Sequence, residues 1–304
     1  MKSVSRREFL NGACMSAGIL LRPSLIRADS LNVPIGLQLY SVREMLPRDF
    51  EGTLKQISAI GYREVEAAGF YGHPASDAKK MMSHANLKCV SAHYSLTDLL
   101  KSSDAIIEYA QNIGLEWVIC SVPSTADAER LSNHPGDRPQ DIFPDLTLDD
   151  WKWNADQLNQ LGRRIKAAGL DFGYHNHTRE FRDLDGKTGF NVLLKETDPE
   201  YVTLELDCGW AVAAGQDPVQ LLTRSPRRFS MLHVKDLKSA PANTAPDKRM
   251  STELGNGCIR YGPIFAAARS AGIRHAFIEQ ENFDMPAFIA LKVDFDNMRS
   301  LELV

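Results

Sequence analysis

Eight short apolar segments alternate with helical patterns along residues 33–304, and this alternation limits the fold more than any other feature of the sequence. Each apolar segment predicts a strand, and the amphipathic stretch after it predicts a helix. The predicted strands are residues 34–40, 62–67, 87–93, 116–121, 170–175, 201–207, 228–234 and 275–280.

Strands that alternate with helices form a parallel sheet whose crossover connections are helical. Eight such units in about 250 residues are the usual content of a (β/α)8, or TIM, barrel. A doubly wound open sheet normally needs fewer units, and no glycine-rich G-x-G-x-x-G turn follows the first strand. We therefore predict an α/β chain with a single (β/α)8 TIM barrel over residues 33–304.

Residues 1–30 have a different character. Arg6 and Arg7 precede an uncharged, mostly apolar stretch at residues 11–21, and a second basic segment leads to Ala28. A basic stretch, a short apolar stretch and a small residue form an export signal, and paired arginines resemble a twin-arginine signal. We predict a twin-arginine-type signal peptide over residues 1–30 and a periplasmic protein. The apolar stretch is too short for a stable membrane insertion.

The charge of the chain argues against a polyanionic partner. Its 304 residues carry a formal net charge of −4, and no long run of lysine and arginine occurs. A nucleic-acid-binding surface requires a concentrated basic patch. We therefore expect a small-molecule substrate and no nucleic acid. A homodimer is expected only because two-fold assemblies are the commonest oligomers.

Polar side chains gather at the carboxyl ends of the predicted strands, where the catalytic residues of TIM barrels lie. Imidazole and carboxylate groups converging on one barrel mouth make a mixed nitrogen and oxygen site. That donor set suits one divalent metal ion, namely Mn, Zn, Co, Fe or Mg, which can polarise substrate oxygens. The strand-end residues are Glu66, His93, His175, His177, Asp207, His233, Lys235 and Glu279.

Several motifs at these strand ends resemble the xylose isomerase-like TIM-barrel superfamily, often labelled sugar phosphate isomerase/epimerase. The motifs are GLQLYSVR, GYREVEAAGFYG, YHNHTREF, LELDCGWA, MLHVKD and FIEQE, and the resemblance covers roughly residues 33–304. Within this superfamily the exported, YHNH-containing sequences form the matching subgroup.

The resemblance implies a metal held by Glu, Asp, His and Glu at the ends of strands five to eight. Asp207, His233 and Glu279 match the last three positions. At the first position this sequence has His175, which would ligate in place of glutamate. His177 and Glu180 are alternatives for the same position.

The resemblance also implies a sugar isomerase or epimerase that acts on a small sugar or glycoside through a metal-stabilised enediolate. Glu279, His175 and Lys235 are the expected catalytic residues. The substrate-binding residues would be Glu66, His93, His177 and Trp210. Because His175 replaces a carboxylate, the alternative is a metal-dependent lyase or hydratase acting on 3-keto sugars or keto-glycosides.

Other interpretations explain less of the pattern. Asp207 could be simply a helix cap, His233 could be a hydrogen-bonded core histidine, and Lys235 could be a surface residue. Glu205 would share the inward side of its strand with Asp207 and could support a ligand. Cleavage of abasic DNA would need more histidine ligands and a basic surface, and a sugar-binding module without catalysis would not need metal ligands.

Overall fold

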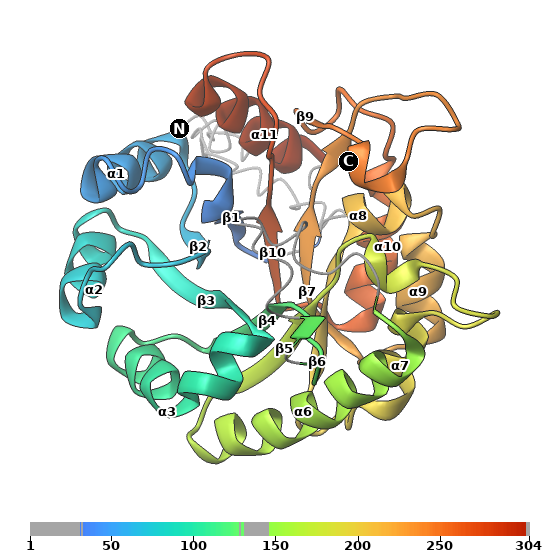
Figure 1. Cartoon of the computed structure of the whole chain (residues 1–304). Helices are drawn as coiled ribbons and strands as arrows, with labels where there is room; N and C mark the ends of the chain where they lie inside the picture. The colour runs from blue at the N-terminus through green and yellow to red at the C-terminus, as the bar shows by residue number, and fades with distance from the viewer. Residues whose placement is uncertain (1–30, 32, 128, 131–145, 302–304) are drawn as a thin grey trace, which may run out of the picture.

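The structure is a computed structural model that describes residues 31, 33–127, 129–130 and 146–301. These residues form a closed barrel of eight parallel strands in the order β1-β10-β7-β6-β5-β4-β3-β2. Helices surround the strands in a ring (Figure 1). The predicted TIM barrel is thus confirmed. The predicted signal peptide lies outside the described residues and stays a prediction.

The barrel strands agree closely with the predicted segments. They are β1 (Ile35–Gln38), β2 (Glu64–Ala67), β3 (Lys88–Ser95), β4 (Trp117–Val122), β5 (Asp171–His175), β6 (Thr203–Asp207), β7 (Phe229–Val234) and β10 (His275–Ile278). Two further strands, β8 (Asp236–Leu237) and β9 (Ser251–Thr252), pair outside the barrel.

The helices follow the strands. They are α1 (Phe50–Ile60), α2 (Ala75–His84), α3 (Leu96–Ile113), α6 (Leu148–Ala167), α7 (Gly189–Glu196), α8 (Cys208–Ala213), α9 (Pro218–Arg224), α10 (Tyr261–Ala271) and α11 (Ala287–Leu301). Three short 3-10 helices occupy Leu39–Val42, Arg179–Phe181 and Pro246–Lys248. None of the helices in the described part of the chain has the length and apolar character needed to cross a membrane.

Local sequence signals set several helix ends. Thr147 begins α6 with a capping box, in which its hydroxyl accepts the Asp150 N–H and the Asp150 carboxylate accepts the Thr147 N–H. Gly114 ends α3 in the left-handed conformation that glycine adopts without strain. The first strand ends earlier than predicted, because the Gln38 side chain accepts the Tyr40 N–H at 3.0 Å and begins a 3-10 turn.

The barrel interior is apolar below and polar above. Trp117, Ile119, Met231 and Phe277 belong to a buried apolar cluster inside the strands. Because successive side chains of a strand point to opposite faces, inward positions recur every second residue. On β7 the inward residues after Met231 are His233 and then Lys235, just past the strand end. The polar side chains of the barrel therefore lie above a buried apolar layer.

The connection between β7 and α10 is fixed by one carboxylate. Asp236 Oδ2 accepts the N–H groups of Gly255 and Gly257 at 2.9 and 3.1 Å, and its Oδ1 accepts that of Ile259 at 3.0 Å. The β8–β9 pair lies within this connection. The segment of residues 239–260 is thus an organised structure at the mouth of the barrel.

A buried carboxylate in α11 gives the fold a pH dependence. Asp294 is 1% exposed, and its Oδ1 accepts the Leu254 N–H at 2.6 Å. Burial, with added repulsion from Glu253 and Asp236, raises the pKa of Asp294 to about 7. Because the native pKa of Asp294 is above the unfolded value, the protonated carboxyl stabilises the folded state at low pH. That contribution is lost as the pH rises through about 7.

We expect Asp294→Asn to flatten the fall in the free energy of unfolding between about pH 4 and about pH 7. The native pKa lies roughly three units above that of an unfolded aspartate, which bounds the effect at about 4 kcal/mol. Denaturant unfolding at several pH values measures it. Asp296→Asn changes a side chain of the same helix that is 43% exposed and is the control. A wild-type pH dependence in Asp294→Asn would contradict the expectation.

Candidate metal centre

Three buried side chains at the mouth form a group that we call the upper group: Asp207, His233 and Glu279. Asp207 ends β6 and lies beside His233 in the strand register. Glu279 follows β10, where its N–H donates to the Val234 carbonyl. One ligand atom from each residue lies within 4.8 Å of the other two. His233 Nδ1 is 3.0 Å from Glu279 Oε2 and 3.8 Å from Asp207 Oδ2.

Asp207 serves two purposes. Its Oδ1 accepts the Trp210 N–H at 2.7 Å and so caps α8, a short helix that the sequence analysis did not predict. Its Oδ2 takes no part in the cap; it is buried and lies 3.0 Å from the ammonium of Lys235. The helix-cap and ligand interpretations of Asp207 are therefore compatible, because they use different oxygens.

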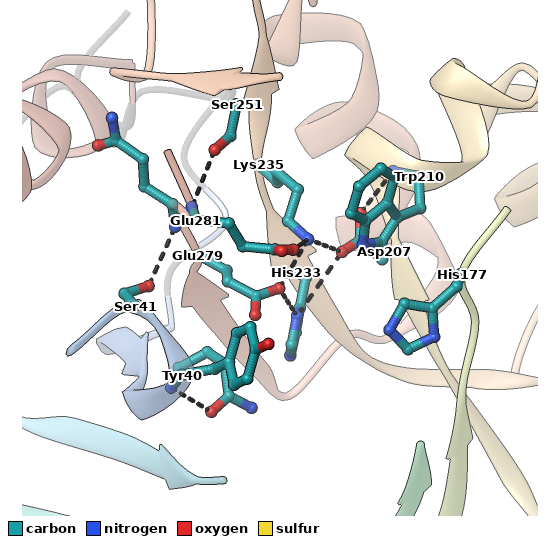
Figure 2. Close-up of polar contacts among 12 residues, drawn as sticks. Tyr40, Ser41, His177, Asp207, Trp210, His233, Lys235, Ser251, Glu279 and Glu281 are labelled. Atoms are coloured by element: carbon teal, nitrogen blue, oxygen red, sulfur yellow. Dashed lines mark hydrogen bonds and ion pairs between the residues drawn. The ribbon is translucent and has the colours of Figure 1, made fainter. Parts of the chain in front are cut away.

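The ammonium group of Lys235 lies among three carboxylates (Figure 2). Its Nζ is 3.0 Å from Asp207 Oδ2, 2.9 Å from Glu279 Oε2 and 2.6 Å from Glu281 Oε1. It also lies 4.3 Å from the centre of the Trp210 ring. Burial opposes the charge, but the three carboxylates raise the pKa of Lys235 above its usual value. Lys235 is therefore a buried cation, not a surface residue.

A second cluster, the lower group, consists of His93, His175, Glu205 and the edge of the His233 ring that carries Nε2. Glu205 Oε2 is 2.9 Å from His93 Nε2, 3.1 Å from His175 Nδ1 and 3.4 Å from His233 Nε2. Glu66 borders this group, with Oε1 2.8 Å from Nε2 of both His93 and His233. His233 thus faces the upper group with Nδ1 and the lower group with Nε2.

The predicted ligand set is divided between the two groups. Asp207, His233 and Glu279 come together, whereas His175 lies beside Glu205 in the strand register and faces that carboxylate. Of the two alternatives for the strand-five ligand, Glu180 accepts the Tyr174 hydroxyl and the His177 N–H, at 2.8 and 2.9 Å. Glu180 is therefore tied to its own loop.

His177 lies at the mouth, on the side of the upper group where Trp210 lies (Figure 2). Its ring centre is 6.3 Å from that of Trp210 and 4.9 Å from that of His175. Burial and the ammonium of Lys235 lower the pKa of His177 to about 3. A neutral imidazole at this position can accept a hydrogen bond from a substrate hydroxyl.

Glu279 in the upper group and Glu205 in the lower group stay ionised in spite of their burial, whereas burial raises the pKa of Asp207. Burial alone would raise the pKa of Glu279, but Lys235 and His233 hold it below its usual range. Burial and Glu66 oppose ionisation of Glu205, yet His233 and His175 lower its pKa to about 2. Burial lowers the pKa of His93, but Glu66 and Glu205 raise it to about 9. Negative charge is therefore concentrated where a cation would bind.

Two residues that support the lower group were not identified from the sequence. Gln38 Nε2 donates to Glu66 Oε1 at 2.7 Å, and Ser91 Oγ donates to Glu66 Oε2 at 2.5 Å. Both stand in barrel strands that pair with β2. The period-two pattern of inward positions could have shown Gln38, which lies beside Glu66 in the register.

Among curated proteins, the chain is similar in sequence to several inosose dehydratases. The chain is 24% identical over 252 residues to the inosose dehydratase of Geobacillus thermodenitrificans, covering 77% of this chain and 83% of that protein. It is 25% identical over 236 residues to the inosose dehydratase of Clostridium beijerinckii, covering 71% of this chain and 76% of the relative.

Comparison with solved structures gives the same barrel. A sugar phosphate isomerase/epimerase from Parabacteroides distasonis superposes with a TM-score of 0.69 at 26% identity, covering 86% of this chain and 96% of the other. A family model described as "Xylose isomerase-like TIM barrel" matches residues 54–291, well over half of the sequence. The chain therefore belongs to the xylose isomerase-like TIM-barrel family.

Proposed function

We propose that this protein is a divalent-metal-dependent lyase that removes water, or another leaving group, from a small polyhydroxy ketone. A keto-sugar, a keto-glycoside or an inosose has the required chemistry. The observation that carries the proposal is the Lys235–Glu281 pair, a proton donor and a proton acceptor 2.6 Å apart beside the upper group. The names of the curated relatives, which are dehydratases, support elimination over the isomerisation that the resemblance alone placed first.

The residues present fit a metal ion. Asp207 Oδ2 is buried and already faces a cation, the ammonium of Lys235 at 3.0 Å, so this oxygen is suited to a metal ion that takes the place of the ammonium. The two groups and their borders contain the carboxylates of Glu66, Glu205, Asp207, Glu279 and Glu281, which outnumber the cations Lys235, His93 and His233 beside them. Buried carboxylates require compensating positive charge, and the nitrogen and oxygen donor set suits Mn²⁺, Zn²⁺, Co²⁺, Fe²⁺ or Mg²⁺.

Asp207, His233 and Glu279 would hold the ion. When bound, the ion would polarise the ketone oxygen and so acidify the neighbouring C–H bond. Lys235 would then leave its contacts with Asp207 and Glu279, because two cations compete for the same two carboxylates. Its contact with Glu281 does not involve a proposed ligand, so that pair can persist.

Elimination then needs one base and one acid. Glu281 is the base, because its side chain is 17% exposed and reaches the mouth. It takes the proton from the carbon next to the ketone, and the C–H electron pair forms a C=C bond as the β-hydroxyl leaves. Lys235 gives that hydroxyl a proton, so it departs as water. Transfer of a proton from Glu281 to Lys235 restores the pair.

His175 was expected to be catalytic, but our proposal gives the acid–base role to Lys235 and Glu281. The His175 side chain is 2% exposed and faces Glu205, below the upper group. Trp210 presents its ring at the mouth on the other side of Lys235 from Glu281 (Figure 2). It would pack against the apolar face of a sugar ring.

Isomerisation or epimerisation is the second candidate. Two solved structures from Parabacteroides distasonis, at 25% and 26% identity, are described as sugar phosphate isomerase/epimerases. The first half of both reactions is the same, since each begins with removal of a proton next to a carbonyl. The reactions differ in whether a leaving group departs afterwards.

Lys235→Met tests the competition between the ammonium and a metal. Without metal, we expect the variant to lose about 3 kcal/mol of unfolding free energy, because it leaves buried carboxylates uncompensated. Excess Mn²⁺ should restore most of that loss, measured by thermal unfolding with and without the ion. Lys238→Met, which removes an exposed ion pair with Asp284, is the control and should cost less than about 1 kcal/mol. An equal loss with and without Mn²⁺ would argue against a shared cation site.

Incubation with keto-sugars and inososes in the presence of Mn²⁺ or Co²⁺ tests the reaction itself. Elimination should produce a conjugated ketone that absorbs in the near ultraviolet, whereas isomerisation should leave no new chromophore. Glu281→Gln and Lys235→Met should each lower kcat by roughly 10²- to 10⁴-fold, the usual contribution of a general acid or base. Glu44→Gln, in the turn after β1, is the unaffected control. Turnover without ultraviolet absorbance would favour the epimerase.

A further inference from the structure

We propose that the lower group is a second divalent-metal site, in which His93 Nε2, His175 Nδ1, Glu205 Oε2 and His233 Nε2 are the ligands. The proposal shares His233 with the centre of the proposed function but none of its other ligands. The two can therefore fail separately.

The distances from Glu205 Oε2 to the three ring nitrogens fit tetrahedral coordination. Ligands at about 2.0–2.1 Å from a tetrahedral zinc ion lie roughly 3.3 Å from one another. Glu205 Oε2 is 2.9 Å from His93 Nε2, 3.1 Å from His175 Nδ1 and 3.4 Å from His233 Nε2. All four donors lie within 4.8 Å of one another. Three imidazoles and one carboxylate form a ligand set typical of zinc.

Hydrogen bonding alone explains this arrangement poorly. A carboxylate oxygen offers two lone pairs, yet Glu205 Oε2 faces ring nitrogens of His93, His175 and His233. The second oxygen of Glu205, Oε1, is buried and has no hydrogen-bond partner among the described residues. A cation at the centre would engage all three nitrogens and the carboxylate together. Binding would release the protons that the coordinating nitrogens carry.

The donors are held by rigid elements. They come from four barrel strands, namely β3, β5, β6 and β7. His175 and Glu205 are neighbours in the register of β5 and β6. Glu205, His175 and His233 are at most 2% exposed, so water competes little for the site. A site built on strand ends needs little reorganisation when it binds an ion.

His233 connects the two sites. Its Nδ1 faces Glu279 at 3.0 Å, and its Nε2 faces Glu205 at 3.4 Å. Occupation of both sites would remove both ring protons and leave an imidazolate between two cations. The lower ion would then act on the upper one through this ring, whose negative charge the two ions would share.

Metal stoichiometry tests the proposal without an activity assay. The full chain would be treated with chelator, reloaded with Zn²⁺, freed of excess ion and measured by elemental analysis. We expect two equivalents per chain in the wild type. Glu205→Gln and His175→Gln should each keep one, Asp207→Asn should keep one, and His233→Gln should lose most of both. Glu64→Gln alters a buried His–Glu pair with His275, 2.9 Å apart and outside both groups, and should keep two.

Each other outcome has a defined meaning. One equivalent in the wild type that survives Glu205→Gln but not Asp207→Asn would overturn the lower site and leave the proposed function intact. One equivalent that survives Asp207→Asn but not Glu205→Gln would support the lower site and remove the basis of the proposed function. If circular dichroism shows that a variant is unfolded, Co²⁺ titration of the wild type decides. Two steps in the visible absorption support the proposal, and one step contradicts it.

Discussion

The concentration of carboxylates inside the barrel is the constraint on which the rest of the site depends. Glu66, Glu205, Asp207 and Glu279 are buried above an apolar layer, and each lies within 3.8 Å of a ring nitrogen of His233. Buried charges of one sign are tolerated only when cations or strong donors compensate them. The barrel supplies Lys235 and the histidines for this purpose. The positions of these cations follow from the carboxylates, and so does the capacity of the mouth to accept a metal.

The fold and the inward side of each strand could be predicted from the sequence, because both follow from periodicity. Eight strand–helix units determine the barrel, and alternation places Glu205 and Asp207 on one side of β6. The position of each side chain along the barrel axis could not be predicted. His175 and His177 have the same parity, and only the stagger between β5 and β6 puts His175 beside Glu205. The pairing of β6 with β7 also contains an irregularity at Leu204 and Glu205. Stagger depends on barrel closure, which no local pattern encodes.

The same limit applies to the residues that support the site. Gln38 and Ser91 hold Glu66 through contacts between different strands, so neither has a signal in its own segment beyond its polarity. Glu281 was recognisable as a strand-end carboxylate but could not be distinguished from Glu279. Its separate role becomes visible through its partner, since it contacts Lys235 and not His233. Hydrogen-bond partners that are distant in sequence are what the structure adds.

The loop after β7 controls the geometry of the proposed acid–base pair. Ser251 Oγ accepts the N–H group of Glu281 at 2.8 Å (Figure 2) and that of Asn282 at 2.9 Å. Ser251 is in turn placed by the β8–β9 pair, which begins at Asp236, the residue after Lys235. The segment from Asp236 to Ser251 thus connects the two residues: its first residue follows Lys235, and its last holds the Glu281 backbone. A catalytic pair on such a segment keeps its spacing when the ammonium leaves Asp207 and Glu279, because Ser251, which holds the Glu281 backbone, is not a metal ligand. The mouth can therefore exchange one cation for another without losing the groups that move protons.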